Sequence, residues 1–196
     1  MKKIADGNLL NIDIEHLEKL DKEVVKNAKV VNDIVLEIVK KATSEIDELV
    51  FEIKEKLKSA TPMDTEQLEI YAMEISTNLY YLGQSQEYIG LRYDVSKAVY
   101  KEKYAIAYAG AVGTISDKTS QAEAIVNYEF IEQSINERAY KRLKVKIENA
   151  TELLQTIKKI ISRRIAEYEL TKVSSSDIRM DNNKRERKLS VVGRRD

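Results

Sequence analysis

The sequence predicts an all-α protein of three long helices that form an extended helical hairpin or bundle with coiled-coil packing. Two observations favour this class. The 196 residues include only one Pro and six Gly, whereas strand-rich sandwiches and barrels need a turn signal every ~8 to 12 residues. Apolar side chains also recur every three or four residues over long stretches, as one face of a helix requires.

The first predicted helix makes up an N-terminal segment, residues 1–60. Apolar residues between Leu17 and Leu57 recur with a mean spacing of roughly 3.6 residues. This spacing keeps them on one face of a nearly straight helix, because a strict seven-residue repeat would drift around it. Asn11 or Asp13 can cap the start of this helix.

A helical hairpin is predicted for residues 61–170, with its first helix over about 62–110. Thr61 followed by Pro62 is typical of a helix start, since Thr caps the first turn and Pro fits the first helical position. Gly110 and Gly113 can adopt the left-handed conformation that often ends a helix.

The second helix of the hairpin is predicted over about 120–170, and the pattern Ser120-x-x-Glu123 is a candidate capping box at its start. Later in this helix the apolar spacing alternates between three and four residues, which is typical of a coiled-coil seam. We therefore expect a homo-oligomer. The seam residues are Leu143, Ile147, Leu154, Ile157, Ile161 and Ile165.

Residues 171–196 are predicted to form a flexible basic tail. From Lys172 onward there are eight basic and four acidic residues and few large apolar side chains. Such a segment buries too little apolar surface to offset the entropy of ordering it.

Composition excludes several classes of site. The chain has no Cys and only one His, His16, so disulfides, thiolate zinc sites, cysteine nucleophiles and multi-His metal sites are absent. Gly-rich phosphate loops, G-x-S-x-G and HExxH motifs are also missing. We expect no enzyme activity, metal or cofactor. No stretch approaches ~18 uninterrupted apolar residues, which predicts a cytoplasmic protein that does not span a membrane.

Lys and Arg number 33, as do Asp and Glu, so any nucleic-acid affinity must come from local clusters of positive charge. Eight of the eleven tyrosines lie between Tyr71 and Tyr108. Aromatic rings beside cations can stack unpaired bases and follow phosphates. The other interpretation is that these rings fill half-buried helix interfaces. The candidate binding residues in this helix are Arg92, Lys97, Lys101, Lys103, Tyr104 and Tyr108, with Tyr93 and Tyr100 on the same side.

A second candidate is a basic patch in the helix over 120–170, with five cations in nine residues and no acid among them. Such a patch can neutralise several phosphates. Alternatively it is a solvated face whose cations pair with Glu132, Glu137 or Glu148. The patch consists of Arg138, Lys141, Arg142, Lys144 and Lys146. In an antiparallel hairpin, residues 100–108 face about 123–132, and the patch lies near 85–92.

The central sequence resembles phage recombination mediator proteins of the UvsY type, small helical proteins that bind single-stranded DNA. The resemblance lies in Tyr100 to Thr114, Ser116 to Ala124, Tyr140-Lys141-Arg142-Leu143 and Leu154 to Arg164. It implies a ring-shaped oligomer in the host cytoplasm that helps a RecA-like recombinase displace a single-strand-binding protein. It also implies that Lys97, Lys101 and Lys103 occupy the DNA-contacting stretch before the turn.

The sequence therefore predicts a non-enzymatic recombination mediator that binds single-stranded DNA and assists loading of a RecA-like recombinase. One alternative is a structural or adaptor coiled-coil protein, for example a phage virion or scaffold component, without nucleic-acid binding. Another is a curved helical module whose cations face anionic lipid headgroups.

Overall fold

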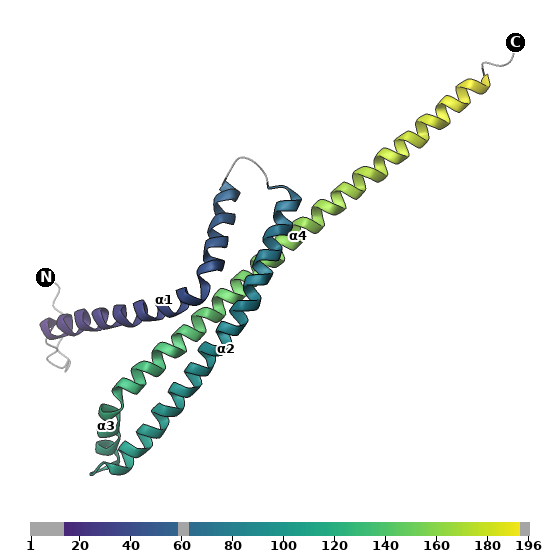
Figure 1. The fold of residues 1–196 in the computed structure, drawn as a ribbon. Helices are drawn as coiled ribbons and strands as arrows, with labels where there is room; N and C mark the ends of the chain where they lie inside the picture. The colour runs from purple at the N-terminus through teal and green to yellow at the C-terminus, as the bar shows by residue number, and fades with distance from the viewer. Residues whose placement is uncertain (1–13, 59–62, 193–196) are drawn as a thin grey trace, which may run out of the picture. The chain divides into compact units, whose positions relative to one another are not determined.

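The structure is a computed structural model that describes the backbone of residues 14–58 and 63–192. Within these residues helices are joined by short turns and no strand is present, which confirms the all-α class (Figure 1). The described residues form four helices rather than the three that the sequence predicts. They are α1 (Ile14–Lys58), α2 (Thr65–Gly110), α3 (Ile115–Ile125) and α4 (Asn127–Val192).

The single helix predicted over 120–170 is wrong in two respects: helical structure already begins at Ile115, and it is interrupted at Val126 between α3 and α4. Thr114 caps α3, and its hydroxyl accepts a hydrogen bond from the backbone N–H of Asp117 at 3.3 Å. The Asp117 carboxylate in return accepts the backbone N–H of Thr114 at 2.9 Å. This reciprocal capping box starts the helix at Ile115. Ser120, the expected cap, lies inside α3.

Most of the predicted tail, residues 171–196, belongs to the last helix. The backbone of α4 stays helical through Val192, and residues 193–196 lie outside the described part. No Gly or Pro occurs between Thr171 and Val192, so the backbone contains no residue that breaks a helix. The predicted caps Asn11, Asp13 and Thr61 lie outside the described residues.

The start of α2 is capped by Asp64, whose Oδ1 accepts the backbone N–H of Gln67 at 2.7 Å. The helix then runs without interruption to Gly110. It passes through Gly83 and Gly90, although glycine lowers helix propensity.

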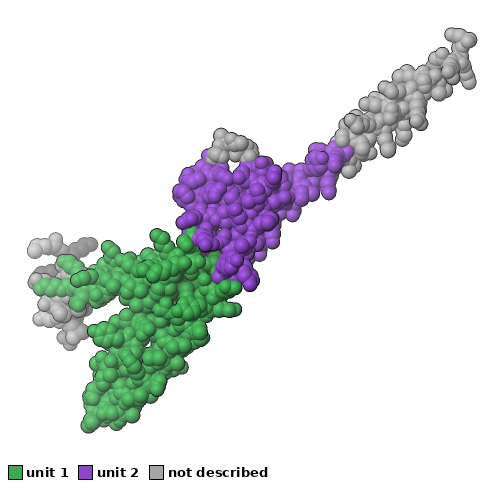
Figure 2. Space-filling view, viewed as in Figure 1, with its two compact units in different colours: residues 1–44, 82–145 green, residues 45–81, 146–196 purple. Residues whose placement is uncertain are grey.

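The chain divides into two compact units, coloured separately in Figure 2. Unit 1 consists of residues 1–44 and 82–145, and unit 2 of residues 45–81 and 146–196. Because α1, α2 and α4 each contribute to both units, the units cut across the predicted segments 1–60 and 61–170.

Unit 1 contains the antiparallel hairpin that the sequence predicts. The rings of Tyr100 on α2 and Phe130 on α4 lie 5.8 Å apart, and those of Tyr93 and Tyr140 are stacked at 6.4 Å. Residues 100–108 therefore face the region around 130, in agreement with the expected register. The buried apolar residues of this unit are Val35, Val39, Leu82, Ile89, Ala122, Val126, Ala139 and Leu143.

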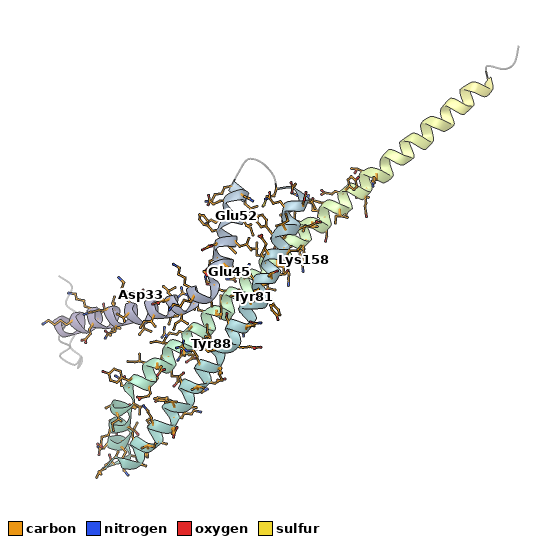
Figure 3. The ribbon with its side chains drawn as sticks, in the orientation of Figure 1. Asp33, Glu45, Glu52, Tyr81, Tyr88 and Lys158 are labelled. Atoms are coloured by element: carbon orange, nitrogen blue, oxygen red, sulfur yellow. The ribbon has the colours of Figure 1, made fainter. Side chains whose placement is uncertain are left out.

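Unit 2 joins the last part of α1 from Glu45, the first part of α2 up to Tyr81, and α4 from Lys146. Figure 3 shows Glu45 and Glu52 on α1, Tyr81 on α2 and Lys158 on α4. The Tyr71 hydroxyl donates to Glu52 Oε1 at 2.9 Å. The buried apolar residues are Ile46, Leu49, Ile53, Leu68, Tyr71, Ile75, Ala150, Leu154 and Ile157.

The predicted oligomerisation seam is largely covered within one chain. Leu143, Leu154 and Ile157 are buried, and Ile147 and Ile161 are half-buried. Of the six seam residues only Ile165 is substantially exposed, at 48%. The stripe on α4 shares its units with the apolar residues of α1 and α2, so burial does not require a second copy.

Candidate nucleic-acid interface

Three tyrosines form a row along α2 close to the hairpin turn. The ring centroids of Tyr100 and Tyr104 are 6.1 Å apart, and those of Tyr104 and Tyr108 are 6.2 Å apart. All three side chains are half-buried, so each ring keeps part of its surface open to solvent. We call Tyr100, Tyr104 and Tyr108 the tyrosine row.

Two lysines accompany the tyrosine row on the same side of α2. Lys97 precedes Tyr100 by three residues and Lys101 precedes Tyr104 by three, and helical residues at this spacing are surface neighbours. Lys101 is exposed, whereas Lys97 is half-buried. The Lys97 ammonium lies 5.6 Å from the centroid of the Tyr93 ring, a cation–π arrangement.

Lys103 is engaged by a carboxylate. Its ammonium forms an ion pair with Glu129 on α4. The hydrogen bond between the two side chains is the main reason why the pKa of Lys103 is raised and that of Glu129 is lowered. The charge of Lys103 is thus largely neutralised within the protein.

Arg92 lies apart from the tyrosine row. It borders a hollow of about 440 Å³ between α1 and α2, together with Lys41 and Tyr88. Because Arg92 and Lys97 are five residues apart, they point to different sides of the helix. The structure does not group Arg92 with Lys97 and Lys101.

The basic patch is not a single surface. Lys146 belongs to unit 2, where it forms an ion pair with Asp47. Lys141 Nζ lies 2.5 Å from Glu137 Oε1, which is one of the pairings that the alternative interpretation expected. Arg138 and Lys144 are exposed.

The remaining patch residue, Arg142, donates a hydrogen bond to Asn32 Oδ1 on α1 at 3.2 Å. Along α4, Arg138 and Arg142 lie eight and twelve residues beyond Phe130, or roughly 12 to 18 Å. Arg138 and Arg142 are therefore separate from the tyrosine row within unit 1.

Two residues of this region were missed in the sequence. Phe130 extends the tyrosine row across to α4, and the carboxylate of Glu129 reduces the positive charge of Lys103. Both lie within residues 123–132, the stretch expected to face the tyrosines. The predicted register therefore placed this stretch opposite the tyrosines, but it did not indicate which side chains would be in contact.

The described residues offer no metal site, because no group of three or more His, Cys, Asp or Glu side chains among them could hold an ion. Nor does any helix in the described ranges have the length and apolar character that crossing a membrane requires. Comparisons of the chain with protein-family models, with curated proteins and with solved structures found no match.

Proposed function

We propose that the chain is a non-enzymatic protein that binds single-stranded DNA and acts as a recombination mediator. The observation that carries the proposal is the tyrosine row with Lys97 and Lys101 beside it. Stacking of a base on an aromatic side chain contributes ~1 to 3 kcal/mol and tolerates any base sequence. Partly exposed rings about 6 Å apart offer such stacking surfaces, and the lysines offer charges to the phosphates.

The ion pairs restrict which cations contribute. Lys103, Lys141 and Lys146 each face a carboxylate, which leaves Lys97 and Lys101 as the main phosphate contacts near the rings. Two such contacts predict a slope of about −1.4 for log affinity against log salt concentration, because each phosphate on a single strand contributes about −0.7. Five contacts would give roughly −3.5 by the same rule.

The loading of a RecA-like recombinase onto strands covered by a single-strand-binding protein is the more specific part of the proposal. It is supported by the likeness of residues 100–114 and 140–143 to the mediator family. Assembly of several copies on one strand would add avidity to weak contacts in each copy. Ile165 and the other exposed apolar side chains of α1 and α4 are available for such assembly.

The proposal is tested by titrating fluorescein-labelled oligo(dT) at about 50 mM and 200 mM salt. We expect Tyr104→Ala to weaken binding by roughly 5- to 150-fold, the equivalent of one lost stacking contact, and Tyr104→Phe to retain affinity. The double variant Lys97→Gln/Lys101→Gln should flatten the salt dependence. Lys158→Gln, which removes an exposed lysine of unit 2, is the matched control.

A structural or adaptor coiled-coil protein is the second candidate. It is favoured by the three lysine–carboxylate pairs and by exposed apolar side chains such as Val24 and Phe51, at 62% and 63%. This function predicts self-association without DNA affinity. Mass photometry with and without the oligonucleotide separates the two, because only a mediator captures DNA. Binding weaker than micromolar at low salt, or indifferent to salt, would contradict the mediator.

A further inference from the structure

A groove of about 780 Å³ lies in unit 1 between the first half of α1 and the start of α4. Both walls belong to the part coloured green in Figure 2. The buried side chain of Val35 borders it, and Val24 and Val145 remain 62% and 52% exposed. The apolar side chains along the groove are Val24, Ala28, Val31, Val35, Phe130, Ile131 and Val145.

Charge in the groove is of one sign. Its lining contains Arg138, Lys141 and Arg142 and neither Asp nor Glu. Lys141 and Arg142 follow Arg138 by three and four residues, so both lie on the same side of α4 as Arg138. The hydrogen bond that Arg142 donates goes to the neutral amide of Asn32, which brings no negative charge to the guanidinium. Lys141 forms an ion pair with Glu137, which is not one of the residues that line the groove.

The length of the groove corresponds to that of a short helix. Its α1 wall runs from Val24 to Val35 and its α4 wall from Phe130 to Val145. At 1.5 Å per residue these stretches are roughly 16 and 22 Å long. An occupying helix would therefore place about three to four turns between the walls.

The chemistry of the walls discriminates between occupants. Single-stranded nucleic acid binds by stacking its bases on aromatic rings, and Phe130 is the one aromatic side chain among the described residues that line the groove. Aliphatic side chains instead suit the apolar face of an amphipathic helix, which recognises grooves of this kind. A basic border on one side favours acidic residues flanking that apolar face.

We propose that this groove docks an acidic amphipathic helix of another protein. The apolar face of the helix lies against Val31, Val35 and Val145, and its carboxylates face Arg138 and Arg142. Docking here does not depend on DNA binding by α2, because the groove includes none of the tyrosine row or of its two lysines.

The test uses the full chain and a fluorescein-labelled synthetic helix with Leu at three- and four-residue spacing and Glu elsewhere. Saturable binding that weakens with salt is expected. One control peptide carries Lys in place of Glu and therefore loses charge complementarity. A second carries Ser in place of Leu and loses its apolar face. Each should bind roughly tenfold more weakly or worse.

Variants locate the binding. Arg138→Glu/Arg142→Glu should lower the affinity for the acidic peptide by roughly tenfold or more, because the reversed charges repel the carboxylates of the peptide. Lys158→Glu, on an exposed lysine outside the groove, should have no effect. Val145→Glu places a negative charge on the apolar wall of the groove and should weaken peptide binding by a separate route. Its control is Leu170→Glu, because Leu170 is 70% exposed and lies outside the groove. Circular dichroism verifies that each variant is folded.

Several results would overturn the proposal. Equal binding of the lysine peptide, or an unchanged affinity in both groove variants, would show that the groove does not recognise an acidic helix. If Val145→Glu dissociated an oligomer and the peptide never bound, the groove would be an interface between copies. Loss of oligo(dT) binding in Arg138→Glu/Arg142→Glu, without any peptide binding, would assign the cations to nucleic acid. If the tyrosine variants left the affinity for oligo(dT) unchanged, that result would contradict only the DNA-binding function proposed for α2.

Discussion

The ring of Tyr140 on α4 lies against Gly90 on α2, so closely that a Cβ at residue 90 would be 3.2 Å from Tyr140 Cε2. The same ring is stacked on Tyr93 with an interplanar angle of 12°. Glycine thus permits the close approach of the two helices of the hairpin. Gly83, seven residues earlier on α2, has nothing within 4 Å of such a Cβ.

The two glycines should respond oppositely to substitution. Gly83→Ala should raise the free energy of unfolding by ~0.5 to 1 kcal/mol, because Ala favours the helix and meets no neighbour. Gly90→Leu should lower it by ~1 to 3 kcal/mol, since the added side chain displaces the Tyr140 ring. Urea denaturation followed at 222 nm measures both. A stabilising Gly90→Leu would show that α2 and α4 do not approach at this point.

The turn before α3 depends on a second glycine. Gly113 has a φ of +124°, and a Cβ there would be 2.9 Å from the Asp117 side chain. Gly113→Ala should therefore destabilise the protein by more than about 1 kcal/mol, and Thr114→Ala should cost ~0.5 to 2 kcal/mol through loss of the cap. Gly110→Ala is the matched control, because nothing lies within 4 Å of its Cβ. Equal effects at residues 110 and 113 would contradict the turn geometry.

The same cap predicts a pH dependence. Hydrogen bonds from the Thr114 hydroxyl and backbone lower the pKa of Asp117, so the folded state binds its proton less tightly than the unfolded state. The stabilisation is complete above the unfolded pKa, about 3.9, and is lost as the pH falls through the lower folded value. Asp117→Asn should therefore be less sensitive to acid below about pH 4. Thermal denaturation over a series of pH values tests this; an unchanged acid sensitivity would contradict it.

The all-α class and the register of the hairpin could be predicted because both depend on spacing. Apolar periodicity defines the helix faces, and the glycine turn near residue 113 sets which residues of α2 and α4 meet. The cap of α3 was misplaced because Thr114-x-x-Asp117 and Ser120-x-x-Glu123 are both plausible capping patterns. Helical geometry alone does not choose between them.

The candidate site was less predictable for a different reason. The positive charge of Lys103 depends on whether a carboxylate comes within reach from another helix, and Glu129 is distant in sequence. Similarly, Lys146 meets Asp47 across 99 residues of chain. Cation density along one helix therefore overestimates the charge that remains for a ligand.

Burial of the seam predicts which substitutions act on folding rather than on assembly. Ile157 is 3% exposed and Ile165 is 48% exposed. Ile157→Ala should lower the free energy of unfolding by ~2 to 5 kcal/mol at any protein concentration, because its cavity forms within one chain. Ile165→Ala should change it by less than ~1 kcal/mol. Urea denaturation at two widely different protein concentrations makes the comparison. A concentration-dependent loss in Ile157→Ala would place residue 157 between copies.

The Lys103–Glu129 pair gives a gain-of-binding test for the proposed DNA interface. Glu129→Gln removes the carboxylate that neutralises Lys103, so the lysine becomes available to a phosphate close to the tyrosine row. The affinity for oligo(dT) at low salt should rise. The slope of log affinity against log salt should also become steeper by about 0.7, the contribution of one phosphate on a single strand.

Two controls separate this effect from a general change in charge. Glu169→Gln removes an exposed acidic charge on α4 in unit 2 and should leave the slope unchanged. In Lys103→Gln/Glu129→Gln the gain should vanish, because the liberated charge is gone, and the cycle of single and double variants isolates the coupling. If Glu129→Gln leaves affinity and slope at the wild-type values while Tyr104→Ala still weakens binding, DNA passes over the rings without reaching Lys103. Its path then follows the side of α2 that carries Lys97 and Lys101.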